Sequence, residues 1–427
     1  MKDRRDSLVP PALIRFLQGG FPLAVLAVSA AVLGLLGGSS EIIVADGKVV
    51  NKAAEAGTPD SLMRRGQPGG EAADPEHYLL LVTSVLITKF TSQSVALIDR
   101  SAYDGVAVPF LHAYDASAIP SAVEMTSKIA EWKKTTGKDL WPWIYLNRMV
   151  GVNPSQRRQF ETRWPYFLKI QGADLEDKAG ARSEFLQYWC NSLRAAKAVQ
   201  APGIVVDLEF YNYHEEYNVG LLARETGKKP QEVVDLLRQV GQRMMDIVAT
   251  EYPTATLWFL FTDLAEEGFA TVGTESFYPS PAYVVQGLLD RAQRSRAPLK
   301  VISGGEVSLG YCSASLDQLR MKIANRAKAF APQLQRYPGI LELGGTITLW
   351  TEPAGKSGWV KEKCAPSDAS TVEDLQPYLE LLLQSYRYNW VYAMGDGSYY
   401  AFDPRSAPRF DAVISKARAR VQTVPRH

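Results

Sequence analysis

The segment GIVVDLEFYN, residues 203–212, joins an apolar run to two carboxylates placed two positions apart. Side chains alternate between the two faces of a β-strand, so Asp207 and Glu209 share one face with Val205, whereas Leu208 lies on the other. The apolar face is expected to pack against helices. The segment is therefore predicted to be a buried strand whose acidic residues point away from the helices at its end.

Seven other segments have the same apolar character, and helical patterns separate them. The eight predicted strands span residues 78–83, 104–110, 140–147, 203–210, 256–263, 300–305, 346–350 and 389–394. The predicted helices include 121–137, 182–199 and 230–252. Eight such strands alternating with helices predict a (β/α)8 barrel, an α/β fold in which the acidic face of 203–210 points to the barrel axis. The alternative is a doubly wound open sheet, which often has a glycine-rich first turn, and no G-x-G-x-x-G follows the first strand.

The chain before the barrel is expected to serve for export and tethering. Residues 1–20 carry four basic side chains, and the apolar stretch 21–36 follows them, with a length between that of a signal peptide and that of a membrane span. We expect residues 1–38 to be a signal peptide or an uncleaved membrane anchor, and 39–76, rich in Gly, Ala, Pro and acidic residues, to be a flexible linker. The barrel, 77–420, would then be secreted, periplasmic or anchored outside the cytoplasm.

The composition limits the partners. The chain of 427 residues has 47 basic and 46 acidic side chains without long blocks of either sign, so no nucleic-acid partner is expected, and membrane contact is expected only through an uncleaved N-terminal segment. Cys190, Cys312 and Cys364 have no metal-ligand spacing, and their odd number excludes a fully paired set of disulfides. No metal or cofactor is expected, and the oligomeric state stays open.

The carboxyl ends of the strands should hold the functional residues, because ligands bind at that face of (β/α)8 barrels. Asp104 lies at the opposite end, where its strand starts, and is expected to be structural. The candidate substrate-binding residues are polar or aromatic and lie near or beyond the carboxyl ends of strands: His112, Tyr145, Asn147, Arg148, Tyr211, Glu306, Tyr311, Trp350, Trp390 and Tyr392. Aromatic rings and hydrogen-bonding groups suit a carbohydrate.

Asp207 and Glu209 are the candidate catalytic carboxyls of the fourth strand. Neighbouring carboxylates make each other harder to ionise, so one pKa should rise while the other stays low, and a general acid needs a raised pKa. The alternative is that both pair with Arg148 or another cation in a buried ion network.

These residues resemble the (β/α)8 glycoside hydrolases, and more specifically the broad group with an acid/base Glu after strand four and a nucleophile Glu after strand seven. The resemblance implies that Glu209 is the acid/base and Glu352 the nucleophile, with Asp207 adjusting Glu209. That group usually has Asn before the strand-four Glu, and Leu208 stands there in this sequence. The family is not identified.

A second resemblance is to the chitinase-like barrels, whose fourth strand ends in D-x-E. Asp207 and Glu209 match the end of that pattern, whereas Val205 replaces its preceding Asp. This version implies no nucleophilic role for Glu352, and Tyr311 or Tyr392 would orient the sugar.

The sequence thus predicts an exported, glycoside hydrolase-like barrel that cleaves glycosidic bonds by carboxylate acid/base catalysis. One alternative is a non-catalytic carbohydrate-binding or cell-envelope scaffold, favoured by the aromatic segment YNWVYAMGDGSYYAF, residues 388–402. Another is a lyase or metal-dependent hydrolase that holds a divalent cation between Asp207, Glu209, Glu306 and His112.

Overall fold

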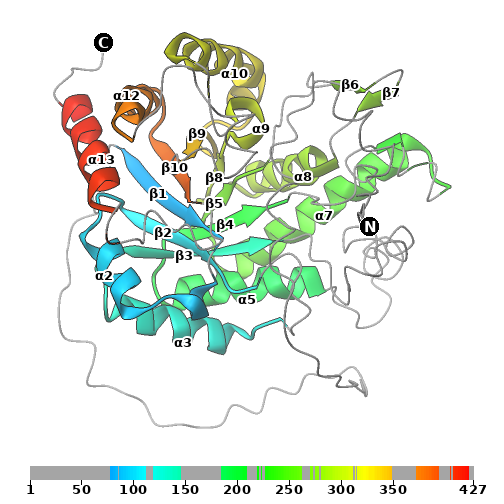
Figure 1. Ribbon diagram of the computed structural model, residues 1–427. Helices are drawn as coiled ribbons and strands as arrows, with labels where there is room; N and C mark the ends of the chain where they lie inside the picture. Colours follow the sequence, from blue (N-terminus) through cyan, green and yellow to red (C-terminus); the bar gives the residue numbers. More distant parts are fainter. Residues whose placement is uncertain are drawn as a thin grey trace, which may run out of the picture.

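The computed structural model of the chain shows a barrel of strands surrounded by helices (Figure 1). It describes residues 77–84, 86–111, 119–145, 184–208, 219–220, 223, 227–261, 270–272, 275–277, 280–310, 313, 315–348, 372–393, 404 and 407–422. The predicted signal or anchor and the linker lie outside these residues. Among the helices that are described, none has the length and hydropathy needed to cross a membrane.

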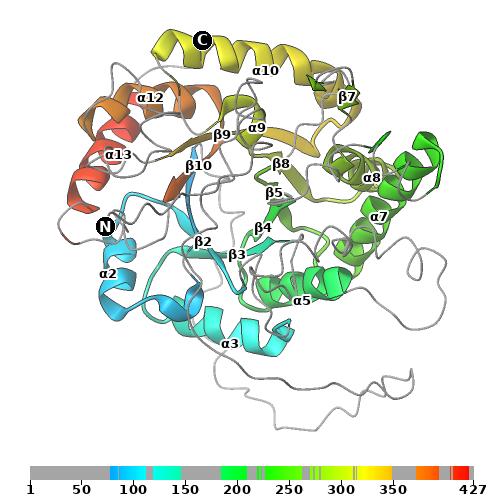
Figure 2. The ribbon, with the colours of Figure 1, turned by 45° about the vertical axis from the view of Figure 1, so that its right-hand side comes forward.

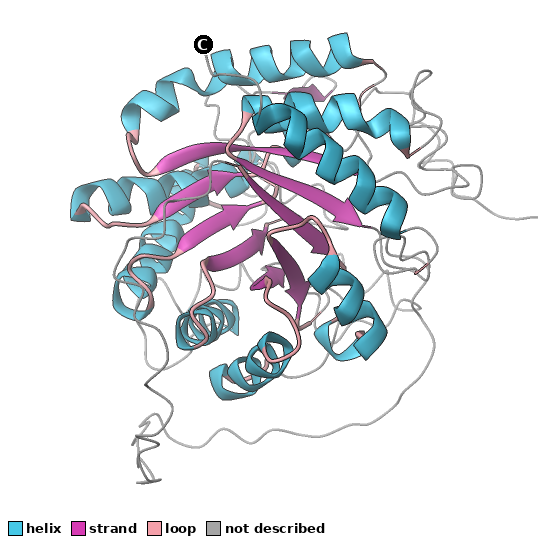
Figure 3. Ribbon diagram, turned by 90° about the vertical axis from the view of Figure 1, so that its left-hand side faces the viewer, coloured by secondary structure: helices cyan, strands magenta, loops and turns pink. Residues whose placement is uncertain are grey.

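Eight parallel strands close the barrel in the order β1-β10-β9-β8-β5-β4-β3-β2. Their bounds are β1 Tyr78–Thr83, β2 Gly105–Pro109, β3 Asp139–Tyr145, β4 Gly203–Asp207, β5 Thr256–Phe259, β8 Lys300–Ser303, β9 Leu341–Thr348 and β10 Tyr388–Ala393. Figure 3 shows these strands enclosed by helices on the outside. The predicted (β/α)8 barrel is confirmed, and the sheet is not an open doubly wound one.

The helices lie around the barrel wall, as the turned view in Figure 2 also shows. They are α2 Ser92–Arg100, α3 Ala122–Lys133, α5 Glu184–Ala198, α7 Pro230–Glu251, α8 Ser280–Ser295, α9 Glu306–Leu309, α10 Leu316–Arg336, α12 Gln376–Ser385 and α13 Ala407–Gln422, with short 3-10 turns η2 Ile87–Lys89 and η5 Glu373–Leu375. Local signals start several of them: Ser121 and Glu124 form a reciprocal capping box at α3, and the Ser315 hydroxyl accepts from the backbone N–H of Gln318 at α10.

Several features differ from the prediction. Strands β4, β5 and β8 end at Asp207, Phe259 and Ser303, before the predicted limits of 210, 263 and 305. Strand β9 begins at Leu341. The predicted start at residue 346 was too late, because Gly344 and Gly345 weaken the strand pattern of the sequence. A Cβ atom on Gly345 would lie 2.3 Å from Asn389 Oδ1, so the close approach of β10 requires glycine there. The antiparallel pair β6 Ala270–Val272 and β7 Glu275–Phe277 was not predicted.

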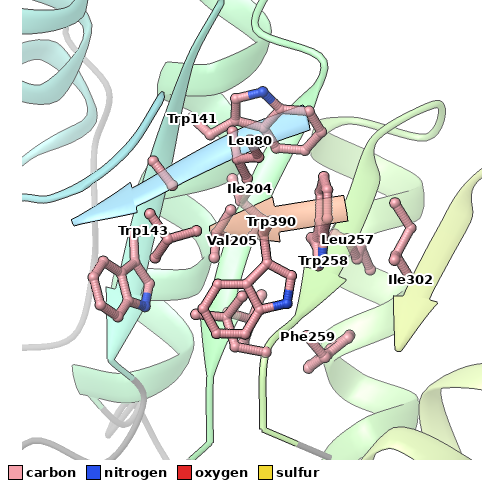
Figure 4. Close-up of a cluster of buried hydrophobic side chains, with 14 of the residues drawn as sticks. Leu80, Trp141, Trp143, Ile204, Val205, Leu257, Trp258, Phe259, Ile302 and Trp390 are labelled. Atoms are coloured by element: carbon pink, nitrogen blue, oxygen red, sulfur yellow. The ribbon is translucent and has the colours of Figure 1, made fainter. Parts of the chain in front are cut away.

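Aromatic side chains fill much of the barrel interior (Figure 4). The Trp141 and Trp258 rings meet edge to face with centroids 5.8 Å apart, and Tyr78 and Tyr388 pack against Trp258 at 6.3 and 5.7 Å. Phe259, the next residue along β5, instead stacks on Trp189 of α5 outside the wall. The contacts among the inward-facing rings show that the barrel interior is a packed core.

Candidate functional site

The fourth strand places Asp207 at the carboxyl end of the barrel and on its inner face. Val205 is in register with Trp143 of β3 and with Trp258 of β5, and Asp207 is in register with Tyr145, the last residue of β3. Residues in register on neighbouring strands face the same side of a sheet. Asp207 is only 3% exposed. The predicted inward direction of the acidic face is therefore confirmed for this residue.

Beside Asp207, four aromatic residues form what we call the mouth aromatic cluster: Trp143, Tyr145, Trp390 and Tyr392. The Trp143 ring lies 4.6 Å from the Tyr145 ring and meets the Tyr392 ring edge to face at 6.4 Å, centroid to centroid. Because β1 and β2 separate β10 from β3 along the wall, the contact between Trp143 and Tyr392 crosses the interior. All four side chains are buried.

Trp143 was missed by the sequence analysis. Its indole Nε1 is buried and has no hydrogen-bond partner among the residues that the structure describes. An unsatisfied buried donor costs about 1–3 kcal/mol, so a polar partner at this position would be favourable. The sequence could have indicated Trp143, because side chains two positions apart in a strand face the same side, and Trp143 therefore points inward together with Tyr145.

Trp390 and Glu306 meet at the end of β8. The indole Nε1 of Trp390 donates to Gly304 O at 2.9 Å, which places this fully buried side chain under the turn after β8. Glu306 begins α9, is 6% exposed, and donates its backbone N–H to Leu260 O at 3.3 Å. The ends of β5 and β8 are thus joined at Glu306.

The structure therefore brings Asp207, Tyr145 and Tyr392 together at the mouth, with Trp390 below the turn that carries Glu306. The other predicted site residues lie outside the described residues, and their roles stay predictions: Glu209, Glu352, His112, Asn147, Arg148, Tyr211, Tyr311 and Trp350. No group of three or more His, Cys, Asp or Glu side chains within the described part of the chain could hold a metal ion.

The opposite, amino-terminal end of the barrel contains polar groups that pair with one another. The Asp104 carboxylate accepts two hydrogen bonds of 2.9 Å from Arg418 of α13 and one of 2.7 Å from the backbone N–H of Leu79. The predicted structural role of Asp104 is therefore confirmed. It fastens the last helix to the strands.

Asp139 and Tyr78 form a second pair at this end. Tyr78 Oη donates to Asp139 Oδ2 at 3.0 Å and accepts from Trp141 Nε1 at 2.9 Å. Burial raises the pKa of the Asp139 carboxyl above its usual range and is also the main cause of the raised pKa of Tyr78. Both shifts favour the protonated forms.

Comparison with known proteins gives no match to a family model and none to a curated protein. Solved structures that align with the chain include a glycoside hydrolase family 5 enzyme from Prevotella bryantii, with 10% identity, a TM-score of 0.45 and coverage of 80% of this chain and 96% of that one. A family 5 xyloglucanase from Paenibacillus pabuli has 10% identity, a TM-score of 0.42 and coverage of 81% and 98%. A xylose isomerase domain protein from Planctomyces limnophilus aligns at 12% identity, with a TM-score of 0.37 and coverage of 82% and 100%.

The expected resemblance to glycoside hydrolase barrels thus recurs among solved structures, and no family is identified by it. The fold assignment itself rests on the closed order of the eight parallel strands.

Proposed function

We propose that this barrel is a glycoside hydrolase that cleaves glycosidic bonds in an oligo- or polysaccharide. The observation that carries the proposal is the buried carboxyl of Asp207 on the inner face at the end of β4, beside the mouth aromatic cluster. A sugar ring presents apolar C–H faces and many hydroxyls, so a binding site needs aromatic surfaces next to a few polar groups. The described part of the mouth combines both.

In this proposal Glu209 is the proton donor and Asp207 keeps it protonated. The alternation predicted from the sequence directs Glu209 to the same face as Asp207, and a carboxylate at Asp207 would then oppose the ionisation of Glu209. Glu209 then protonates the glycosidic oxygen as the bond to the anomeric carbon breaks. Glu352 is the nucleophile in the retaining version, which needs a second carboxyl about 5–5.5 Å from the acid.

The test is Glu209→Gln in the intact chain, assayed for reducing ends released from a panel of polysaccharides. Loss of the proton donor should lower kcat by about 10²–10⁴-fold, because acid catalysis contributes that much. The thermal unfolding midpoint should stay at the wild-type value. Wild-type turnover in this variant would refute the assignment of Glu209, and a wild-type protein that releases no reducing ends from the panel would refute hydrolysis.

A second candidate function is carbohydrate binding without turnover, and the mouth aromatic cluster favours it equally. Ring stacking alone holds a sugar and needs no proton donor. Calorimetric titration of the same polysaccharides separates the two functions. Binding without release of reducing ends would establish a binding scaffold, and release of reducing ends would exclude it.

We also propose that the barrel acts outside the cytoplasm, on the basis of the basic residues and the apolar stretch 21–36. A fusion of residues 1–76 to a reporter that is active only after export should give signal. Deletion of 21–36 should abolish it. Equal signal from both fusions would contradict export by this segment.

A further inference from the structure

The turn after β8 is fixed on the side of the barrel interior. Gly304 donates its backbone N–H to Phe259 O at 2.6 Å, and its carbonyl accepts the indole N–H of Trp390 at 2.9 Å. A Cβ atom on Gly304 would lie 2.7 Å from Phe259 O and 3.1 Å from Trp390 Nε1. Figure 4 shows the Trp390 ring among the inward side chains, with its nitrogen on the side of Phe259. The turn therefore lies directly against the indole and sets its orientation through one hydrogen bond.

Arg326 of α10 fixes the same turn from outside the barrel. Its guanidinium donates to Ser303 O at 2.7 Å, to Ser303 Oγ at 3.1 Å and to Gly344 O. The register of β8 with β9 runs as far as Ser303 and Leu343, so these hydrogen bonds join the two strands where their own pairing ends. The planar fork of an arginine can reach both strands at once. Arg326 thus sets the position at which the turn leaves the barrel wall.

The Arg326 guanidinium is enclosed by glycines and aromatic rings. A Cβ atom on Gly305, whose φ is +83°, would lie 2.9 Å from the guanidinium carbon and 3.1 Å from Gly344 O. The Phe330 and Tyr386 ring centroids each lie 5.3 Å from the same carbon. Cation–π attraction therefore offsets part of the cost of burying the charge, and the glycine in the turn leaves room for the guanidinium.

Stability alone does not favour an arginine at this place. Arg326 is 2% exposed. Within the described ranges, its hydrogen bonds go to backbone and hydroxyl oxygens, no carboxylate pairs with it, and its Nε has no acceptor. A buried cation without an opposite charge is costly, and apolar side chains of similar volume often replace buried ions without loss of stability. The geometry that the guanidinium imposes on β8 and β9 is therefore the better explanation for it.

Trp390 connects this turn to the mouth aromatic cluster. Its ring meets the Tyr392 ring edge to face with centroids 6.5 Å apart, and Tyr392 meets Trp143 at 6.4 Å across the interior. The buried Trp143 indole N–H, which has no partner in the described part of the chain, is a donor available for a saccharide oxygen. Because packed interiors transmit displacements, a shift of the turn would move Trp390 and then the two rings that it supports.

We propose that Arg326 is a positioning residue for saccharide binding at the mouth. It holds the turn after β8 in place, and the turn orients Trp390 through a backbone carbonyl. Trp390 in turn supports the Tyr392 and Trp143 rings. The inference rests on the carbohydrate binding that both functions proposed above share. It requires no contact between Arg326 and the saccharide, because Arg326 acts from outside the barrel wall.

The first experiment compares Arg326→Met with Arg418→Ala in the full chain, by calorimetric titration of a polysaccharide that the wild-type protein binds. Arg326→Met should lower the affinity about 2–30-fold, the range for residues that act on a site through packed neighbours. Arg418 binds Asp104 at the opposite end of the barrel, so Arg418→Ala should keep the wild-type affinity although it costs stability. Wild-type affinity in folded Arg326→Met, or an equal loss in Arg418→Ala, would overturn the positioning role.

A double-mutant cycle tests the path through Trp390. Trp390→Phe keeps an aromatic ring but removes the hydrogen bond to Gly304 O. If Arg326 acts through that hydrogen bond, the effects of Arg326→Met and Trp390→Phe are not additive, and the double variant should bind as tightly as the weaker of the two single variants. Additive losses of binding free energy would show that Arg326 does not act through Trp390.

A milder pair of variants covers the case in which Arg326→Met does not fold. Ser303→Ala removes the hydroxyl that accepts from Arg326, and Ser192→Ala removes a buried hydroxyl that donates to Tyr188 O at 2.8 Å within α5. Both should cost similar stability, because each removes one buried hydrogen bond. Only Ser303→Ala should lower the affinity, by about twofold or more. Equal affinities of the two variants would contradict the role of Arg326.

The outcomes distinguish this inference from the proposed function. If the wild-type protein binds or cleaves a polysaccharide and the Arg326 and Ser303 variants keep its affinity, the function stands and the positioning role is wrong. If the wild-type protein neither binds nor cleaves any polysaccharide in the panel, the proposed function fails, and the role of Arg326 fails with it.

Discussion

The two ends of the barrel use their polar side chains in opposite ways. At the amino-terminal end, Asp104 binds Arg418 through two hydrogen bonds, and Tyr78 donates to Asp139. These pairs connect strands to one another or to the last helix, so they hold the barrel together. They also leave little polar capacity for a ligand at that end.

At the carboxyl-terminal end, an indole donor and two carboxyls are buried beside the barrel interior. The Trp143 indole N–H has no partner among the described residues, and Asp207 and Glu306 are buried carboxyls above a packed aromatic interior. The Arg326 guanidinium donates hydrogen bonds to main-chain and hydroxyl oxygens and so holds the turn before Glu306 in place. The ion pairs and hydrogen bonds of the first end therefore stabilise the fold, whereas the second end holds its buried carboxyls at the face where (β/α)8 barrels bind ligands.

The largest expected effect is on the amino-terminal end. Arg418→Ala should lower the free energy of unfolding by about 2–3 kcal/mol, because it leaves the partly buried Asp104 carboxylate without its cation. Arg409 on the same helix also forms a two-bonded pair, with Glu373, but both side chains are at least half exposed. Arg409→Ala should therefore cost only about 0.2–1 kcal/mol. Urea unfolding of both variants measures the difference, and equal losses would contradict the special role of this end.

A smaller effect is expected at the carboxyl-terminal end. Trp143→Phe removes the indole N–H but keeps an aromatic ring, so affinity for a saccharide should fall about 2–12-fold, the value of one hydrogen bond. Trp258→Phe is the matched control, because Trp258 Nε1 is also buried and has no partner within the described ranges, but lies deeper, between Trp141 and Tyr388. Calorimetric titration should show wild-type affinity for Trp258→Phe. A similar loss in both variants would show that the mouth N–H is not a ligand donor.

The smallest expected effect is a pH dependence from Asp139. Because burial raises the folded-state pKa, its contribution to stability is fully present below the unfolded pKa of about 3.9 and is lost as pH rises through the raised folded pKa. Asp139→Asn keeps an oxygen that accepts from Tyr78 and removes this titration. The free energy of unfolding of the wild-type protein relative to Asp139→Asn should thus decline from pH 3.5 to 7. A difference that rises with pH would reverse the assigned sign.

The sequence predicted the presence of the barrel strands correctly, but it predicted their first and last residues less accurately. All eight barrel strands were found, because each is a local run of apolar residues between helical patterns. The start of β9 was predicted too late because Gly344 and Gly345 interrupt the apolar pattern. Glycine is needed at Gly345 because side chains at the start of β10 lie close to it, and residues adjacent in the sequence give no sign of that contact. The pair of strands β6 and β7 was missed because each has only three residues.

The candidate site was predicted in part. The inward direction of Asp207 followed from the period of two, and the structural role of Asp104 followed from its place at the start of a strand. Trp143 was overlooked because an indole inside a barrel strand looks like core until it is known that its N–H has no partner in the described part of the chain. The prediction for Glu209 is tested by the Glu209→Gln variant proposed above, and the role of Glu352 stays a prediction.

By itself, the sequence determined the barrel and the end of it at which Asp207 lies, because apolar periodicity and the alternation of strands with helices are local properties. Only the tertiary structure decided which polar groups bind one another. Arg418 reaches Asp104 across 314 positions, and Trp390 reaches Gly304 across 86. Hydrogen bonds between residues so distant in the chain leave no local pattern in the sequence. Only the folded structure therefore shows which polar groups stabilise the amino-terminal end of the barrel.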